Sequence, residues 1–233
     1  MILKERIDEI NSRIRDAAYS CGRNPEEIKL VAVTKTVSAE KIREASVCGV
    51  SVIGESYIQE ARKKYSLLSG TPVSWHFIGH LQTNKAGYAV KMFDLIHSVD
   101  SIRLAEELDI CAKKINKVQN ILIQINAGRE ETKSGINEEA LPDFIMEASR
   151  FQNISIKGLM AIPPFFDDPE RVRPYFSSLR ALRDKIRNLF VSDAVPGVSI
   201  NELSMGMSGD FEAAVEEGST LVRIGTAVFG ERK

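Results

Sequence analysis

The chain has 233 residues, of which 43% are hydrophobic and 27% charged, and its formal net charge is −1. This is an ordinary globular composition, and Lys and Arg are spread too evenly along the chain to form a basic face for nucleic acid. No apolar run reaches the roughly 18 residues that a membrane span requires, and the charged, amphipathic first segment does not resemble a secretory signal. We therefore expect a cytoplasmic protein that binds neither nucleic acid nor membranes.

The cysteines and histidines do not form a metal or disulfide framework. The cysteines are odd in number and widely spaced, as expected for reduced thiols: Cys21, Cys48 and Cys111. The histidines also lack the spacing of metal ligands: His76, His80 and His97. The sequence therefore predicts a protein without a bound metal.

The first predicted element is a helix over residues 2–20. Its apolar side chains recur at helical spacing, and the sequence CGRNP ends it: Ile2, Leu3, Ile7, Ile10 and Ile14. This helix precedes the regular part of the chain.

Strand-like and helical patterns then alternate to the end of the chain. Short, continuous apolar runs predict eight strands, at residues 29–34, 50–55, 74–80, 94–99, 120–127, 154–162, 201–207 and 221–230. Helical patterns fill the intervals, at residues 38–49, 57–68, 84–93, 101–115, 137–151, 168–190 and 208–218. Residues suited to N-caps stand at three of the helix starts: Ser38, Ser101 and Asn137. Continuous apolar strands are typical of a parallel sheet that is covered on both faces.

Eight strands with intervening helices favour an α/β fold that is a single (β/α)8 TIM barrel with an extra N-terminal helix. An open, doubly wound sheet of eight strands is the alternative. No linker, repeat or low-complexity segment divides the chain, so we expect one domain over residues 1–233, with the barrel at 28–233. The proline-rich segment 161–174 is predicted to be the loop after the sixth strand.

The unusual polar residues gather where a barrel would have its functional face, at the carboxyl ends of the strands. Lys35 follows the first strand, where an ammonium group is costly to desolvate unless something receives it. Further polar or unusual residues follow strands two, three, five and six: Glu55, Ser56, Tyr57, His80, Gln82, Asn126 with the segment GREETKSG, and Met160.

The ends of strands seven and eight predict a phosphate site. The segment SMGMSGD (204–210) offers backbone N–H groups around Met207 and Ser208, and Gly225 and Thr226 follow the last strand. Loops after strands seven and eight are the usual phosphate position in barrels. Glycines that only make tight turns are the alternative interpretation.

Arg223 lies inside an apolar strand and therefore needs a partner that accepts its hydrogen bonds. That partner is either a carboxylate of the barrel or a ligand near the phosphate. A phosphate site, a strand-end lysine and an arginine in one barrel mouth suit pyridoxal phosphate. The lysine would condense with the aldehyde, the loops would hold the phosphate and Arg223 would address the ring.

Several motifs occur in one order along the chain: VAVTKTVSAEKI, GESYIQEA, WHFIGHLQTNK, HSVDS, ETKSGIN, GLMAI and LSMGMSGDFEAAVEEGSTLVRIGTAVFG. With them the chain resembles the pyridoxal phosphate homeostasis proteins from about residue 28 to its end. The resemblance implies a barrel similar to the N-terminal domain of alanine racemase, carrying pyridoxal 5'-phosphate.

The resemblance also implies roles for individual residues. Lys35 matches the family's Schiff-base lysine, and Arg223 matches the arginine beside the pyridine nitrogen. Ser208, Gly225 and Thr226 match the phosphate-binding positions. The chain departs from the family in reading GES where members commonly read GEN, so the contact of Ser56 with the cofactor is expected to run through water.

Three functions are compatible with these residues. An arginine beside the pyridine nitrogen keeps that nitrogen unprotonated and makes the ring a weak electron sink. The chain also ends directly after the eighth strand, which would leave the cofactor open to solvent. We therefore expect a monomeric binding protein that buffers the cofactor or delivers it to apo enzymes, with no established catalysis. The alternatives are a weak amino-acid racemase with Tyr57 or His80 as base, and a cofactor-free aldolase that uses Lys35 directly.

Overall fold

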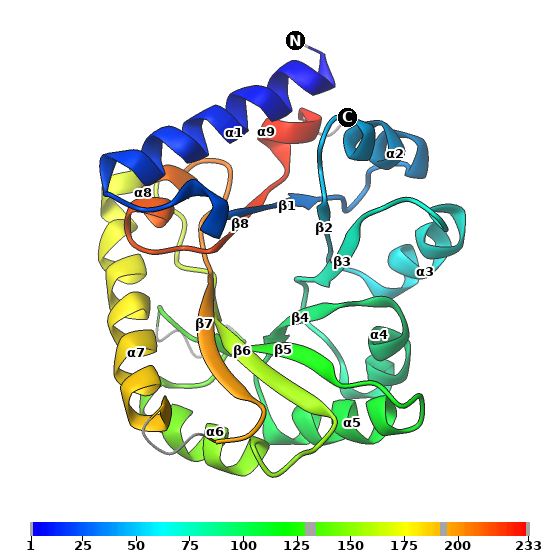
Figure 1. The fold of residues 1–233 in the computed structure, drawn as a ribbon, viewed down its shortest axis with the longest axis vertical. Helices are drawn as coiled ribbons and strands as arrows, with labels where there is room; N and C mark the ends of the chain where they lie inside the picture. Colours follow the sequence, from blue (N-terminus) through cyan, green and yellow to red (C-terminus); the bar gives the residue numbers. More distant parts are fainter. Residues whose placement is uncertain (1, 129–133, 192–194, 232–233) are drawn as a thin grey trace.

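The computed structural model describes residues 2–128, 134–191 and 195–231. Eight parallel strands form a closed barrel in sequence order, and the ring of helices around it is visible in Figure 1. The strands are β1 (Lys29–Val33), β2 (Val52–Glu55), β3 (Ser74–Phe77), β4 (Leu95–Val99), β5 (Gln119–Ile125), β6 (Ile154–Ala161), β7 (Val198–Ser204) and β8 (Leu221–Ile224). The predicted TIM barrel is confirmed, and the open sheet is excluded because β8 pairs with β1.

The helices of the outer layer follow the strands. They are α2 (Ala39–Val47), α3 (Ile58–Leu67), α4 (Ala86–Met92), α5 (Ile102–Lys113), α6 (Leu141–Ala148), α7 (Arg173–Val191), α8 (Phe211–Glu216) and α9 (Thr226–Phe229). Single 3-10 turns lie at Pro25–Glu27, Thr83–Lys85, Glu138–Ala140 and Pro169–Arg171. None of the helices in the described ranges is both long and apolar enough to cross a membrane.

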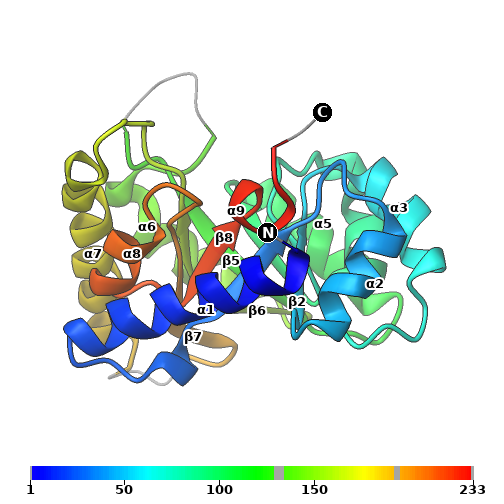
Figure 2. The same cartoon turned by 90° about the horizontal axis from the view of Figure 1, so that it is seen from above.

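Helix α1 (Leu3–Ser20) lies outside the barrel, across α8 and α9 (Figure 2). Its buried stripe includes Ile7, Ile10 and Ile14, as the apolar spacing predicts. Arg13 fastens the helix to α8, because its Nε and one terminal nitrogen each lie 2.8 Å from a carboxylate oxygen of Glu212. The helix thereby covers the side of the barrel where the last strand meets the first.

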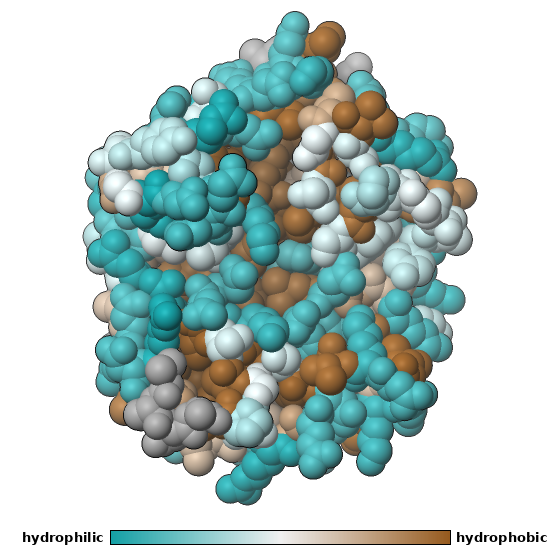
Figure 3. Space-filling view, in the orientation of Figure 1, coloured by the Kyte–Doolittle hydropathy of each residue, from teal (hydrophilic) through white to brown (hydrophobic). Residues whose placement is uncertain are grey.

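Most apolar burial lies between the strands and the helices, and a smaller cluster fills the barrel interior. The interior cluster consists of Val31, Val52, Leu95, Leu122, Met160 and Leu221. Hydrophilic residues cover most of the face in Figure 3, and hydrophobic residues show in the depressions between them. The apolar strands are thus buried on both sides, which explains their continuous apolar sequences.

Several bounds differ from the sequence prediction. The seventh strand lies at Val198–Ser204 and not at 201–207, and the helices expected over 84–93 and 168–190 each begin with a 3-10 turn. Residues 226–229 form the short helix α9 and not the end of the last strand, because Ile224 pairs with Ala32 near the end of β1, which itself stops at Val33. The helix expected over 137–151 is a 3-10 turn followed by α6, and Asn137 precedes that turn without a side-chain cap. The other two N-caps are confirmed, since Ser38 and Ser101 accept from the backbone N–H of Lys41 and Leu104.

Candidate cofactor-binding site

A cavity of about 440 Å³ opens at the carboxyl ends of the strands. Its walls come from the segments after β1, β2, β3, β5 and β6, and its lining residues are Lys35, Ser56, Ile78, Gly79, His80, Gln124, Ile125, Asn126, Ser134 and Ile162. The structure thus brings Lys35 and Ser56 together, as predicted from their strand ends. Part of the predicted GREETKSG segment, residues 129–133, lies outside the described residues.

The backbone on both sides of Lys35 is anchored by charged side chains from α3. The Lys64 ammonium donates to the carbonyl oxygen of Thr34 at 2.6 Å, and Glu60 Oε1 accepts from the backbone N–H of Thr36 at 2.5 Å. Lys64 also donates to the same Glu60 oxygen at 2.6 Å. Thr36 has φ of 66°, a left-handed conformation that is costly for a β-branched residue. These contacts hold the turn that presents Lys35 to the cavity.

Lys64 forms a second, buried ion pair beneath this turn. Its Nζ lies 2.8 Å from Glu55 Oε1, which also accepts from the Thr34 hydroxyl at 2.6 Å. Burial raises the pKa of Glu55, and the hydrogen bonds from Lys64 and Thr34 oppose that rise. These roles were not predicted from the sequence, although the spacing of Glu60 and Lys64 on one helix is a signal for their pairing.

The end of β3 passes very close to the segment after β2. A Cβ atom at Gly79 would lie 2.2 Å from the carbonyl oxygen of Ser56, so only glycine fits there. Ser56 and Lys35 both line the cavity. A contact of Ser56 with the cofactor stays a prediction.

Arg223 is buried with neutral hydrogen-bond partners. One terminal nitrogen donates to Ser204 Oγ at 2.6 Å, and the other donates to the carbonyl oxygen of Ala161 at 2.9 Å. Burial lowers its pKa to about 10, and the charge of Asp210 opposes that shift. In the described part of the chain these two oxygens are its hydrogen-bond partners, although a guanidinium carries five N–H donors in all. An ion pair with a barrel carboxylate is not among the contacts of the described residues, and a ligand contact stays a prediction.

The segments after β7 and β8 lie together, next to β1. The N–H of Gly225 lies 3.4 Å from Ser208 Oγ, and a Cβ atom at Gly225 would lie 3.3 Å from that of Val33. Thr226 begins α9 and is exposed. Because β8 pairs with β1, these residues share the barrel rim with the Lys35 turn.

The N–H of Met207 is already engaged in this segment. It donates to Asp210 Oδ1 at 2.5 Å, and burial raises the pKa of that carboxyl group. An anion that takes the Met207 N–H must displace or neutralise Asp210. This competition was not predicted from the sequence.

His80 also lines the Lys35 cavity, and it lies near an acidic side chain. Its Nδ1 lies 3.3 Å from Ser134 Oγ and 3.8 Å from Asp100 Oδ2. Burial raises the pKa of Asp100. Tyr57, the other base suggested by the sequence, is 59% exposed and does not line this cavity.

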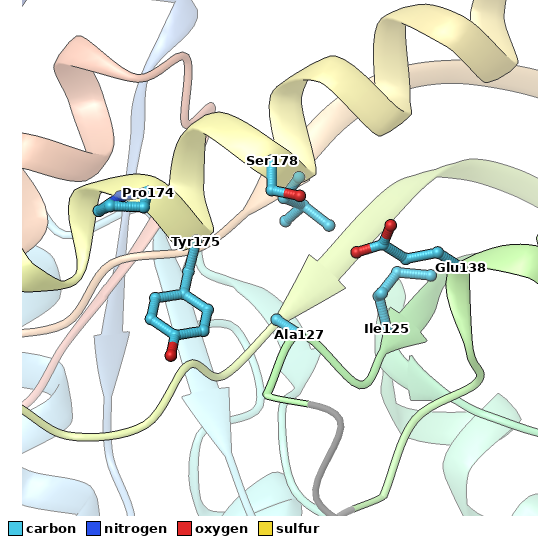
Figure 4. Close-up of a pocket in the computed structure, with 7 residues that line it drawn as sticks. Ile125, Ala127, Glu138, Pro174, Tyr175 and Ser178 are labelled. Atoms are coloured by element: carbon cyan, nitrogen blue, oxygen red, sulfur yellow. The ribbon is translucent and has the colours of Figure 1, made fainter.

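A second, smaller cavity of about 270 Å³ lies between α7 and the end of β5 (Figure 4). In Figure 4 Tyr175 and Ser178 project from α7, and Glu138 faces them from the opposite wall. Of its lining residues, only Ile125 also belongs to the Lys35 cavity, and the predicted site residues do not line it. In the ranges that the structure describes, no group of three or more His, Cys, Asp or Glu side chains is placed to hold a metal ion.

Comparison with known proteins identifies the family to which this protein is similar. Residues 6–233 match the family described as "Alanine racemase, N-terminal domain". The chain is 46% identical over 229 residues to the pyridoxal phosphate homeostasis protein of Aquifex aeolicus, covering 98% of each chain. It is 38% identical over 233 residues to the protein of the same name from Escherichia coli K12, covering 99% of this chain and 97% of that one.

Solved structures agree with the sequence comparison. PipY of Synechococcus elongatus PCC7942 with pyridoxal phosphate bound superposes with a TM-score of 0.84 at 34% identity, covering 98% of this chain and 100% of that one. An alanine racemase of Clostridium difficile 630 gives a TM-score of 0.68 at 17% identity, with 95% of this chain matched to 55% of that one. The latter likeness shows the shared barrel.

Proposed function

Because the chain belongs to the alanine racemase N-terminal domain family, and within it to the pyridoxal phosphate homeostasis proteins, we propose that it holds pyridoxal 5'-phosphate as a Schiff base on Lys35. In this proposal it buffers the cofactor or delivers it to apo enzymes, as a cytoplasmic monomer.

The observation that carries the proposal is that Lys35 lines the cavity after β1, while Arg223 is buried on β8, the strand that pairs with β1. Lys35 lines the cavity, and Arg223 is a buried cation whose described hydrogen-bond partners are a hydroxyl and a carbonyl oxygen. A buried guanidinium with donors to spare fits an acceptor such as a pyridine nitrogen. The residues present therefore suit the cofactor.

The bound cofactor would supply a reactive aldehyde and an electron-accepting ring. Lys35 would hold the aldehyde carbon, and Arg223 would donate a hydrogen bond to the ring nitrogen. Ser208, Gly225 and Thr226 would bind the phosphate with hydroxyl and backbone N–H groups, and Met207 would join them once Asp210 releases its N–H. Ser56, in the cavity wall beside Lys35, would contact the cofactor through water.

The choice of a carrier over an enzyme follows from Arg223. A cation beside the ring nitrogen disfavours protonation of that nitrogen, and an unprotonated ring stabilises carbanions poorly. A weak racemase is the second candidate, because His80 lines the Lys35 cavity with Asp100 behind it. Lys35-dependent racemisation of amino acids at enzyme-like rates would favour that second candidate.

The Schiff base is tested by borohydride trapping. Protein loaded with pyridoxal 5'-phosphate is reduced, digested and analysed by peptide mass. We expect the added mass on the peptide that contains Lys35, and its loss in Lys35→Ala. If Lys35→Ala retained the cofactor's full absorbance, the assignment of Lys35 would be wrong.

A further inference from the structure

A chain of four buried polar side chains crosses the barrel interior and ends on Arg223. Hydrogen bonds link Arg223 on β8 to Ser204 on β7, Ser204 to His97 on β4, and His97 to His76 on β3. His97 Nδ1 lies 2.9 Å from Ser204 Oγ, and His97 Nε2 lies 3.0 Å from His76 Nδ1. All four residues are less than 10% exposed, and His97 and Ser204 are fully buried.

These residues come from four strands on opposite sides of the barrel, so the contacts run through its interior. His97 lies two residues after Leu95 on β4, and Arg223 lies two residues after Leu221 on β8. Leu95 and Leu221 belong to the interior cluster, and residues two apart on a strand share a face. The polar chain therefore forms a layer inside the barrel, above the apolar one.

The donor chemistry of these side chains determines which group donates in each of their hydrogen bonds. Arginine can only donate, so Ser204 Oγ accepts from Arg223. Within the described part of the chain, the only other partner of this hydroxyl is His97 Nδ1. If His97 Nδ1 carried a proton, both Arg223 and His97 would donate to Ser204 Oγ. The proton of the Ser204 hydroxyl would then be buried without an acceptor. The Ser204 hydroxyl therefore donates to an unprotonated His97 Nδ1.

The same reasoning fixes the two imidazole rings. With Nδ1 as an acceptor, neutral His97 carries its proton on Nε2, which donates to His76 Nδ1. Neutral His76 then carries its proton on its own Nε2. Both rings are held neutral by burial, which lowers the pKa of His97 and lowers that of His76 to about 4.

We propose that His97 is a positioning residue for Arg223. We also propose that His76 fixes the tautomer of His97 in which Nδ1 accepts from the Ser204 hydroxyl. The proposal rests on the proposed function, since Arg223 is taken to meet the ring nitrogen of pyridoxal phosphate. These linked side chains point a lone pair of Ser204 at Arg223 and so fix the plane of the Arg223 guanidinium. The last two members of the series are neutral imidazole rings and not carboxylates. The series therefore orients Arg223 without cancelling its positive charge.

The first test uses the cofactor-free protein and needs no binding. Histidine-labelled protein is studied by nuclear magnetic resonance near neutral pH, with His80→Gln used to assign the signals of the chain's other two histidines. We expect His76 and His97 both to be neutral with the proton on Nε2. A proton on Nδ1 of His97, or a cationic His97 ring, would overturn the proposal.

The second test compares two substitutions of His97. His97→Leu removes the acceptor for Ser204, whereas His97→Asn places an amide oxygen near the position of Nδ1. We expect roughly tenfold weaker binding of pyridoxal 5'-phosphate in His97→Leu, with a displaced absorbance band of the bound cofactor. His97→Asn should recover most of the affinity and the wild-type band.

Equal affinity and identical spectra in His97→Leu and the wild type would contradict the positioning role. If His97→Leu does not fold, Ser204→Ala removes the same hydrogen bond to Arg223 with a smaller change of volume, and the same two readouts apply. Failure of the proposed function is distinguishable, because the wild-type protein would then not bind the cofactor while the tautomers remain measurable.

Discussion

The turn that carries Lys35 depends on charged residues that lie outside the cavity. Lys64 and Glu60 contact the peptide groups before and after the lysine, and Lys64 also neutralises the buried Glu55. A buried pair stabilises little by itself, but the loss of one partner leaves an uncompensated charge. The position of Lys35 is thus coupled to the stability of the protein through Lys64.

Replacing Lys64 with Met should therefore reduce the free energy of unfolding by about 3 kcal/mol. The expected cause is the Glu55 carboxylate, which is fully buried and would lose its ammonium partner. Urea unfolding of the cofactor-free protein measures the change. Lys63→Met is the matched control, because Lys63 is the exposed neighbour on the same helix and should stay within about 0.5 kcal/mol of the wild type. Equal stabilities of the two variants would contradict the role of the buried pair.

Asp210 gives a second prediction for a single residue. Its carboxylate holds the Met207 N–H beside the proposed phosphate position, and burial raises its pKa. Asp210→Asn keeps an oxygen acceptor and removes the negative charge, so we expect binding of pyridoxal 5'-phosphate at least as tight as in the wild type. Asp210→Ala removes the charge and also frees the Met207 N–H, so it should likewise bind at least as tightly as the wild type. Fluorescence titration measures both variants, and weaker binding by both than by the wild type would refute this competition.

Among the elements, β6 is irregular against both of its neighbouring strands. The register shifts next to Gly158 on both sides, against β5 and against β7. A Cβ atom at Gly158 would lie 1.9 Å from the carbonyl oxygen of Glu202 on β7. Glycine therefore allows two neighbouring strand backbones to approach at a bulge.

Gly158→Ala should destabilise the protein by about 3 kcal/mol or more, because the strands must separate to admit the methyl group. Gly87→Ala provides the contrast. Gly87 lies in α4, where the added Cβ would meet only Cys111 Sγ at 3.6 Å, so a gain of about 0.5–1 kcal/mol is expected from helix propensity. Thermal unfolding compares the two. A Gly158→Ala variant as stable as the wild type would show that the close approach is not required.

The sequence predicted the elements better than it predicted their ends or their polar contacts. Eight continuous apolar runs were sufficient for the barrel, and N-caps such as Ser38 marked helix starts. The helix α9 was missed because Val228 and Phe229 are buried and apolar, which suits a strand equally well. The contact of Lys64 with Glu55 joins a helix to a neighbouring strand, and one sequence carries no signal for that pairing.

For the whole molecule, the buried histidine pair predicts how stability depends on pH. The folded-state pKa of His76 is lowered from 6.5 to about 4, so the unfolded chain binds more protons between these values. Stability is therefore present above 6.5 and is lost as the pH falls toward 4, by on the order of 3 kcal/mol for this residue. The raised pKa values of Glu55, Asp100 and Asp210 act in the opposite direction.

The contribution of His76 is isolated by difference. Denaturant unfolding of the wild type and of His76→Gln is measured near neutral pH and again about two units lower. We expect a shallower loss of stability in His76→Gln, since glutamine does not titrate. Parallel pH dependences of the two proteins would exclude His76 as the source.

We propose for the whole molecule that Lys35 holds the cofactor reversibly and that the protein releases it without turning over a substrate. The most direct measurement mixes the loaded protein with an apo pyridoxal phosphate enzyme and follows the activation of that enzyme against an equal amount of free cofactor. We expect full activation of the enzyme by the loaded protein, with the amount of cofactor bound to the loaded protein falling in step. An apo enzyme that stays inactive while the loaded protein keeps its cofactor and racemises amino acids in a Lys35-dependent reaction would contradict this proposal.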